Sequence, residues 1–318
     1  MQDREHLFRS LMFVPAHNTR LMDSASRSNA DVLLLDLEDS CQPKENKQLA
    51  RDKIVEYVQS GKFAGRSLYP RVNDRESGEL LKDLSQLTIE GIEGFVYPKA
   101  VCEEDVYFIG KLLETIEYEK GIPVGTFKLI PLIETAGAVI NIMSICRACT
   151  RVVAVAFGCE DFVTDMQGQH DVDGQSIFMA RSTIVAAARA SGVYPIDTVH
   201  IKVHDLEDLE RNLILSKKLG FEGMLVLNPK ELPLVHQYFS PSVEEVEWAE
   251  EMVRLSDEAF SAGKGVAVKD GKFVGPPMLK MAKNILGKQK LIIENAGGVK
   301  VVDFCFFDVL MNCYVVKS

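Results

Sequence analysis

The sequence predicts an α/β fold, a (β/α)₈ TIM barrel followed by a C-terminal helical appendage. Eight short apolar runs alternate with amphipathic stretches over roughly 230 of the 318 residues, and such barrels typically need about 250. A doubly wound sheet would alternate in the same way, but it usually has fewer strands. It would also be expected to carry a glycine-rich fingerprint after its first strand, where this chain has Pro15-Ala16-His17-Asn18. We therefore favour the barrel.

The elements of the barrel follow from the spacing of apolar residues. Each apolar run has the length of a buried strand, and the stretches between the runs have the apolar spacing of a helix. The predicted strands are 10–14, 32–37, 67–72, 94–97, 127–133, 152–157, 196–201 and 224–227. The clearest predicted helices are 47–58, 106–120, 138–148, 179–190 and 206–219.

A different pattern begins after the eighth run. A further helix is predicted over 243–262, because Ser242 suits a helix N-cap and acidic residues follow in the first turn. A segment rich in glycine and proline comes next and ends in a short helix over 278–286. The tail over 299–316 is apolar and β-prone, so we expect it to be buried. We divide the chain into a catalytic barrel domain, 1–240, and an appendage or lid with an atypical tail, 241–318.

Composition and charge narrow the class of protein. A net charge of −10 argues against nucleic acid as a partner, because phosphate binding needs clustered Lys and Arg. The sequence contains no apolar run of the roughly 20 residues that a membrane span requires, so no membrane partner is expected. Seven cysteines without regular spacing indicate reduced thiols and a cytoplasmic protein. A small anionic ligand held by a few local cations remains compatible with this charge.

Polar residues, most of them charged, follow the ends of consecutive predicted strands. Barrel enzymes build their active sites at the carboxyl ends of the strands, so these side chains are expected to share one rim. A single charged residue after a strand is usually a solvated loop residue, but the joint pattern indicates a site. The residues are Asp36, Glu38, Asp39, Arg71, Asn73, Lys99, Glu134 and Asp161.

Glu134 and Asp161 are the candidate metal ligands. Both are acids that follow buried apolar runs on consecutive strands, where they contribute little to packing. Two carboxylates suit a hard cation such as Mg²⁺ and leave most of its coordination sphere open to water and a bidentate ligand. This pattern predicts a Mg²⁺-dependent enzyme in which Glu134 and Asp161 are catalytic.

Arg71 is a candidate for binding and stabilising substrate charge. Its planar guanidinium matches a carboxylate, or an enolate forming beside one. Asp36 and Glu38 lie two residues apart on one strand and point to the same face. They could act in catalysis by holding metal-bound waters, or they could be ion-pair partners of Arg71 or Lys99. The segment Gly158-Cys159-Glu160 is expected to present backbone N–H groups to an anionic substrate.

An ordered series of motifs resembles the family of citrate lyase β-subunit-like proteins, which includes malyl-CoA and citramalyl-CoA lyases. The series runs from Arg9 to Leu286 and is specific as a set. The matching stretches are Arg9-Ser10-Leu11-Met12-Phe13-Val14-Pro15, Leu35-Asp36-Leu37-Glu38-Asp39-Ser40, Arg71-Val72-Asn73, Pro98-Lys99, Leu132-Ile133-Glu134-Thr135-Ala136, Phe157-Gly158 with Asp161, Pro195-Ile196-Asp197 and Gly220-Phe221-Glu222-Gly223.

The resemblance implies a reaction, a metal and an assembly. It implies reversible cleavage of a 3-hydroxyacyl thioester into a 2-oxo acid and an acetyl thioester, with Mg²⁺ on Glu134 and Asp161 and Arg71 on the substrate. Phe13 and Lys99 lie in the matching motifs and are expected to bind substrate. Coenzyme A or an acyl carrier is the implied thioester partner, and a homotrimer or homohexamer is the implied assembly.

The parts that would handle the thioester depart from the family pattern. Asn18 and Ser24 stand where basic residues usually meet the phosphates of coenzyme A, and Met224 and Asn228 replace a usual lysine and histidine. Gly275 occupies the position of an aspartate that some members use as acid or base. The sequence thus leaves three hypotheses: the thioester lyase, a class II aldolase acting on free 2-oxo acid adducts, and a non-catalytic family member that binds metal and dicarboxylate.

Overall fold

The computed structural model describes residues 6–171, 174–261, 267–269 and 272–296. The chain divides into two compact units: Phe8–Phe239 is one, and the residues before Phe8 together with those from Ser240 onward are the other. The apolar tail expected at 299–316 lies outside the described residues.

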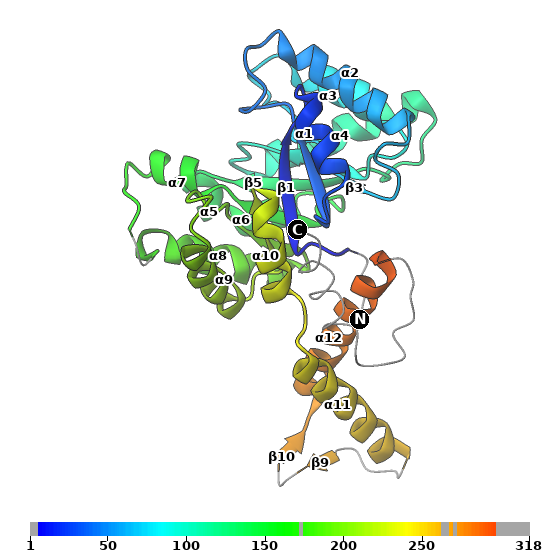
Figure 1. Ribbon diagram of the computed structural model, residues 1–318, viewed down its shortest axis with the longest axis vertical. Helices are drawn as coiled ribbons and strands as arrows, with labels where there is room; N and C mark the ends of the chain where they lie inside the picture. The colour runs from blue at the N-terminus through cyan, green and yellow to red at the C-terminus, as the bar shows by residue number, and fades with distance from the viewer. Residues whose placement is uncertain (1–5, 172–173, 262–266, 270–271, 297–318) are drawn as a thin grey trace, which may run out of the picture. The chain divides into compact units, whose positions relative to one another are not determined.

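The first unit is a barrel of eight parallel strands with helices between them (Figure 1). The sheet order is β3-β2-β1-β8-β7-β6-β5-β4, and isolated bridges from Arg71 to Asp36 and to Val96 connect the second, third and fourth strands. The predicted (β/α)₈ barrel is therefore confirmed. The strands are β1 (Ser10–Pro15), β2 (Val32–Asp36), β3 (Ser67–Leu68), β4 (Gly94–Tyr97), β5 (Lys128–Ile133), β6 (Ala154–Phe157), β7 (Tyr194–Asp197) and β8 (Gly223–Val226).

The helices of this unit cover the outside of the barrel. One helix expected over 138–148 is in fact two, because Asn141 ends the first and caps the second. The helices are α1 (Thr19–Ser26), α2 (Asn46–Gln59), α3 (Leu80–Leu87), α4 (Glu103–Lys120), α5 (Ala136–Ile140), α6 (Ile142–Arg147), α7 (Cys159–Asp165), α8 (Gln175–Ser191), α9 (Leu206–Leu219), the 3₁₀ turn η1 (Pro229–Glu231) and α10 (Leu232–Phe239).

Two predicted strands differ most from their expected bounds, and each contains a proline. The third was expected over 67–72, but Pro70 has no N–H to donate and the ladder stops at Leu68 before Arg71 rejoins it as a bridge. The seventh was expected over 196–201, yet it begins at Tyr194 and includes Pro195. The apolar residues after Asp197 belong to the following loop.

Alternation along the strands determines which side chains reach the mouth of the barrel. In β2, Val32 and Leu34 belong to an inner cluster of buried residues, whereas Leu33 and Leu35 pack in the larger cluster with residues of the helices. Because successive side chains point to opposite faces, Asp36 continues the inner series of β2. In the same way Glu134 continues the series of β5, and Thr198 that of β7. The fold therefore aims these polar side chains at one opening.

The second unit is a pair of helices with a small hairpin. It contains α11 (Val243–Ser261), the antiparallel strands β9 (Ala267–Lys269) and β10 (Lys272–Val274), and α12 (Pro276–Asn295). No strand is predicted here from the sequence, and α12 begins before and ends after the predicted 278–286. A separate buried cluster of Ala249, Met252, Val274 and Ala282 holds this unit together. Within the described residues of both units, no helix is long and apolar enough to cross a membrane.

Candidate active site

Glu134 is a buried carboxylate at the carboxyl end of β5. Its side chain is 3% exposed, and Oε1 accepts a hydrogen bond of 2.6 Å from the backbone N–H of Lys99. Lys99 has a φ of 53°, in the left-handed region that non-glycine residues rarely adopt. Glu134 Oε2 accepts no hydrogen bond from any described residue. One oxygen is therefore fixed by the backbone and the other is available to a ligand.

The surroundings of Glu134 disfavour ionisation of its side chain. Burial, the Glu38 carboxylate and the Asp161 carboxylate together raise the pKa of Glu134 to about 7, although the Lys99 N–H and Arg71 act against this rise. Gly158 lies directly against this side chain, because a Cβ atom at Gly158 would be 2.8 Å from Glu134 Oε2. The absence of a side chain at Gly158 thus brings the start of α7 up to the carboxylate. A bound cation would relieve the repulsion among these acids.

Asp161 is the second predicted metal ligand. It lies in the first turn of α7, is exposed, and forms no hydrogen bond or ion pair with any described residue. Its effect on the pKa of Glu134 indicates that the two carboxylates interact. Glu134 Oε2 and the Asp161 carboxylate, which have no hydrogen-bond partner among the described residues, suit Mg²⁺, because this ion usually takes one or two carboxylates and keeps several waters.

Glu134 and Asp161 would provide two protein ligands to a bound Mg²⁺. The described residues contain no group of three or more His, Cys, Asp or Glu side chains that could hold a metal ion. An ion on Glu134 and Asp161 would therefore fill its remaining positions with water and substrate, which leaves a catalytic site open.

Arg71 is held from two sides by acids. Its Nε donates to Asp36 Oδ1 at 2.7 Å and its Nη2 to Asp36 Oδ2 at 2.8 Å, while Nη1 is 2.8 Å from Glu38 Oε2. Burial opposes the charge of Asp36, but the guanidinium and the hydrogen bonds outweigh it and hold the pKa of Asp36 below its usual value. The same partners raise the pKa of Arg71 despite its burial. Arg71 is a fixed cation in the barrel mouth.

Glu38 connects Arg71 to Lys99. The Lys99 ammonium is 2.9 Å from Glu38 Oε1, and burial raises the pKa of Glu38 even with both cations beside it. Of the two roles that the sequence left open for Asp36 and Glu38, the ion pairs with Arg71 and Lys99 are present in the structure. Phe13 lies under Arg71, with its ring centroid 4.7 Å from the guanidinium carbon. These predicted residues therefore form one contiguous group.

The predicted anion-binding segment Gly158-Cys159-Glu160 needs a correction. The Gly158 N–H already donates to the Ile133 carbonyl at 3.0 Å, and the Cys159 N–H donates to Thr198 Oγ1 at 3.2 Å. The first bond within α7 runs from the Phe162 N–H to the Gly158 carbonyl. Two of the N–H groups expected for a substrate are therefore used to fix the loop itself.

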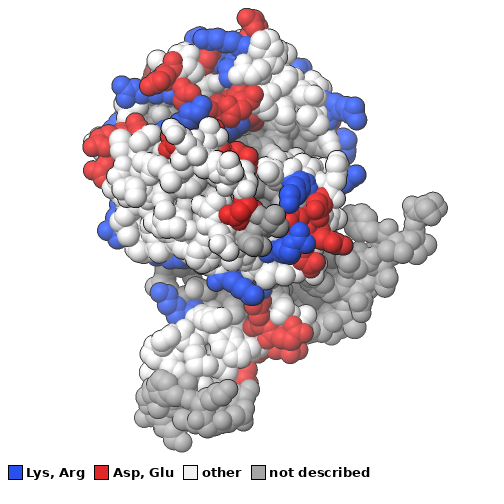
Figure 2. All heavy atoms as spheres, turned by 90° about the vertical axis from the view of Figure 1, so that its left-hand side faces the viewer, with Lys and Arg blue, Asp and Glu red and all other residues white. Residues whose placement is uncertain are grey.

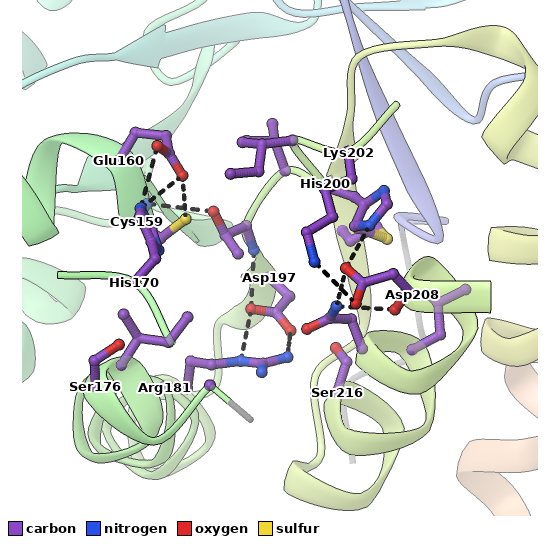
Figure 3. A pocket seen from close by; sticks show the side chains of 18 of the residues that line it. Cys159, Glu160, His170, Ser176, Arg181, Asp197, His200, Lys202, Asp208 and Ser216 are labelled. Carbon is purple, nitrogen blue, oxygen red and sulfur yellow. Dashed lines mark hydrogen bonds and ion pairs between the residues drawn. The ribbon is translucent and has the colours of Figure 1, made fainter. Parts of the chain in front are cut away.

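A pocket lies beside this group, at the ends of β6 and β7. Figure 3 shows Cys159 and Glu160 on one side and His200 and Asp208 on the other, with Arg181 and Asp197 between them. Of the residues predicted from the sequence, only Cys159 and Glu160 line it. Arg71, Lys99, Glu134 and Asp161 do not.

Sequence reasoning missed the polar residues that line this pocket. Asp197 forms an ion pair with Arg181, and Asp208 pairs with His200 at 3.0 Å. The resemblance included Asp197 in a motif but gave it no role. The alternation of β7 contained one usable signal, because Ile196 faces inward and Thr198 must follow it.

Several departures from the family pattern have a local structural role. Asn18 Oδ1 accepts from the Leu21 N–H and caps α1, and Asn228 Oδ1 accepts from the Lys230 N–H and caps η1. Met224 is buried in β8. Gly275 is the residue before α12, where two prolines follow. Both asparagines thus serve as helix caps at positions where basic side chains are usual.

Comparisons with known proteins agree with these motifs. The family model described as HpcH/HpaI aldolase/citrate lyase matches residues 9–229. The chain is 31% identical over 284 residues to the citrate lyase subunit beta of Leuconostoc mesenteroides subsp. cremoris, covering 89% of this chain and 94% of that protein. It is 29% identical over 287 residues to the mitochondrial citramalyl-CoA lyase of Homo sapiens, covering 87% and 84%.

Solved structures give the same result. The protein CitE from Mycobacterium tuberculosis, crystallised with magnesium, acetoacetate and coenzyme A, superimposes with a TM-score of 0.67 at 25% identity, over 88% of this chain and 97% of that one. A citrate lyase from Burkholderia xenovorans LB400 shares the fold with a TM-score of 0.77 at 20% identity, over 89% and 92%. The chain therefore belongs to the HpcH/HpaI aldolase/citrate lyase family of carbon–carbon lyases, as its motifs predicted.

Proposed function

We propose that this protein is a Mg²⁺-dependent lyase that cleaves a 3-hydroxyacyl thioester of the citryl, citramalyl or malyl type into a 2-oxo acid and an acetyl thioester. The observation that carries the proposal is the pair Glu134 and Asp161 beside Arg71. Glu134 has one oxygen without a partner and a pKa raised to about 7, and Asp161 has no partner among the described residues. Two such acids next to a fixed guanidinium suit a cation and an anionic substrate.

The protein's own residues would orient the substrate for this cleavage. Glu134 and Asp161 would hold the cation, which when bound supplies Lewis acidity to the carboxylate and hydroxyl oxygens of the substrate. Asp36 fixes one edge of Arg71, so the Nη1 edge, shared by Glu38 and Asp39, is the part that a substrate carboxylate or carbonyl can approach. Phe13 supports the guanidinium from below, and Lys99 keeps a second positive charge next to Glu38.

The bond that breaks joins the carbon next to the thioester carbonyl to the hydroxyl-bearing carbon. The hydroxyl loses its proton as the 2-oxo acid forms, and the carbon of the departing acetyl thioester gains one. Negative charge builds on the enolate of that thioester, where a nearby guanidinium is most effective. Asp36 and Glu38 act on this step through Arg71 and Lys99. Their second proposed role is to hold metal-bound waters.

The relatives support this reaction class. Two of them are named citrate lyase subunit beta and citramalyl-CoA lyase, and the Mycobacterium tuberculosis protein was crystallised with magnesium and coenzyme A. A turnover assay tests the proposal directly. Purified enzyme with Mg²⁺ is given citramalyl-CoA, malyl-CoA or a citryl thioester, and the release of pyruvate, glyoxylate or oxaloacetate is followed.

We expect one of these substrates to turn over and a chelator to stop the reaction. Glu134→Gln should lower kcat by at least about 100-fold, since it removes a direct ligand where outer-shell changes already cost about 10–100-fold. Glu119→Gln, on the exposed face of α4, is the matched control and should behave as wild type. Turnover of none of the three thioesters, or full activity of Glu134→Gln, would refute the lyase.

A class II aldolase acting on free 2-oxo acid adducts is the second candidate. It is favoured by Asn18 and Asn228, which cap helices at positions where the family usually meets coenzyme A. Calorimetry with coenzyme A separates the two. Micromolar binding, about −8 kcal/mol, favours the thioester lyase, and no binding favours the aldolase. A non-catalytic member would bind Mg²⁺ and dicarboxylate and turn over neither class of substrate.

We also propose a cytoplasmic homotrimer or homohexamer, with residues 241–318 as a lid on the active site of the same or a neighbouring subunit. Figure 2 shows a broad area without charged side chains on the barrel face that carries α5 to α8. These helices and the residue that ends α7 expose apolar side chains, namely Ile140, Met143, Met166, Phe178 and Met179. Such a surface is typical of a protein–protein interface. Light scattering after size-exclusion chromatography tests the assembly, and a monomer at micromolar concentration would contradict it.

A further inference from the structure

We propose that Thr198 is a positioning residue for the metal site, and that the buried pair Arg181 and Asp197 holds it in place. Through Thr198 this group fixes the loop Gly158–Asp161 and so sets the position of Asp161 relative to Glu134. The inference rests on the proposed function, because it assumes a cation on those two acids. It concerns residues that touch neither the cation nor the substrate.

The first contact joins Thr198 to the start of α7. Thr198 Oγ1 accepts a hydrogen bond of 3.2 Å from the backbone N–H of Cys159. Cys159 is buried, and its N–H comes before the first bond within α7, so the helix itself offers it no acceptor. Gly158 on one side of Cys159 packs against Glu134, and Asp161 follows two residues later. This one hydrogen bond therefore lies between the two metal ligands.

The second set of contacts fixes Thr198. Its backbone N–H donates to Asp197 Oδ1 at 2.9 Å. Arg181 of α8 donates to the same carboxylate, with Nε 3.1 Å from Oδ1 and Nη2 in contact with Oδ2. Arg181 and Asp197 are each only 2% exposed. A buried, bidentate pair of this kind has little freedom to move.

Side chains point to alternate faces along β7, so the neighbouring residues Asp197 and Thr198 contact different parts of the barrel. Ile196 faces the inside of the barrel, so Asp197 points outward to α8 and Thr198 points inward to the mouth. Figure 3 shows the resulting chain of contacts, which runs from Arg181 through Asp197 to the loop at Cys159. The end of one strand thus links the helix layer to the loop that carries Asp161.

The test compares variants of Thr198 by metal binding rather than by turnover. Mn²⁺ affinity is measured by electron paramagnetic resonance on the full chain without substrate. Thr198→Val keeps the shape and removes the acceptor, and we expect it to weaken Mn²⁺ binding by about tenfold, the lower end for outer-shell changes. Thr198→Ser keeps the hydroxyl and should bind Mn²⁺ within about twofold of wild type.

A second readout uses the metal-free chain. Hydrogen–deuterium exchange of the peptide that contains Cys159–Asp165 should be faster in Thr198→Val, and in Thr198→Ala if the valine variant does not fold. The matched control is Thr126→Val, because Thr126 Oγ1 bonds only the Pro123 carbonyl at an exposed turn. It should change neither measurement.

The outcomes separate this inference from the proposed function. If wild type binds Mn²⁺ and Thr198→Val binds it equally well, with unchanged exchange at Cys159–Asp165, the positioning role is wrong and the metal site stands. If wild type itself binds no Mn²⁺, the proposed function is wrong and the inference falls with it. If Thr198→Val weakens Mn²⁺ binding and Thr198→Ser does not, the result supports both the positioning role and the proposed metal site.

Discussion

At the scale of the residue, two acids contact the Arg71 guanidinium, and their burial makes their energetic contributions differ. Asp36 is 1% exposed and meets Arg71 through two hydrogen bonds, whereas the Asp39 side chain is 61% exposed and 3.4 Å from Nη1. An exposed pair contributes roughly 0–1 kcal/mol, but removing one partner of a buried pair costs about 3–5 kcal/mol. Asp36 should therefore matter far more than Asp39 to both stability and activity.

Asp36→Asn tests this difference. We expect a loss of about 3 kcal/mol in the free energy of unfolding, measured by urea denaturation, because Arg71 would be left with a buried and poorly compensated charge. Because Arg71 would also lose its orientation, kcat/KM should fall by about 100-fold, the effect of a misplacement of roughly 1 Å. Asp39→Asn is the matched control, with a change within about 0.5 kcal/mol. Equal effects of the two substitutions would show that Asp36 does not orient Arg71.

Most of the candidate site could be predicted from single residues, because the reasoning needed only strand ends and alternation. Asp36, Arg71 and Glu134 follow apolar runs, and a parallel barrel brings such positions together. The left-handed backbone of Lys99 could not be predicted, since nothing in Pro98-Lys99-Ala100 requires it and only the contact with Glu134 explains it. The use of the Cys159 N–H by Thr198 depends on two strands that are distant in sequence.

At the scale of the element, the sequence predicted the existence of strands and helices better than their ends. Apolar periodicity located all eight strands of the barrel, yet Pro70 interrupts β3, and β7 lies earlier in the chain than the apolar run predicted. The hairpin β9–β10 was missed because strands of three residues are too short to produce a pattern. These errors arise where pairing with a neighbouring strand, rather than local sequence, decides the conformation.

The turn η1 after β8 contains a buried acid that should make stability depend on pH. Glu231 is fully buried, its Oε2 accepts from the Leu227 N–H at 3.3 Å, and its Oε1 has no hydrogen-bond partner. Burial raises the pKa of Glu231 from 4.5 to about 7, although backbone hydrogen bonds oppose the rise. The folded state therefore binds this proton more tightly than the unfolded state does.

The sign of the effect follows from this difference. The contribution of Glu231 to stability is fully present below about pH 4.5 and is lost as the pH rises to about 7. Glu231→Gln cannot ionise, so its free energy of unfolding relative to wild type should increase by roughly 2–3 kcal/mol between pH 5 and pH 8.5. Urea denaturation across this range measures the change. Glu207→Gln, exposed on α9, should track wild type, and a pH-independent difference for Glu231→Gln would refute the account.

At the scale of the whole molecule, the proposed chemistry belongs to one of the two compact units. The proposed metal ligands, Arg71 and the positioning residues all lie within Phe8–Phe239, which has its own large core. The residues from Ser240 onward form a separate cluster around Ala249 and Met252 and contribute no described residue to this group. The barrel should therefore bind the cation by itself, and the second unit would affect turnover rather than metal binding.

The central claim is that Glu134 and Asp161 hold one divalent cation beside Arg71. The most direct measurement is anomalous diffraction from a crystal of the full chain grown with Mn²⁺ and pyruvate. We predict a single strong peak at about 2.0–2.2 Å from Glu134 Oε2 and from one Asp161 carboxylate oxygen, with pyruvate between the ion and Arg71. No peak at this position, or carboxylates directed away from a common centre, would contradict the account.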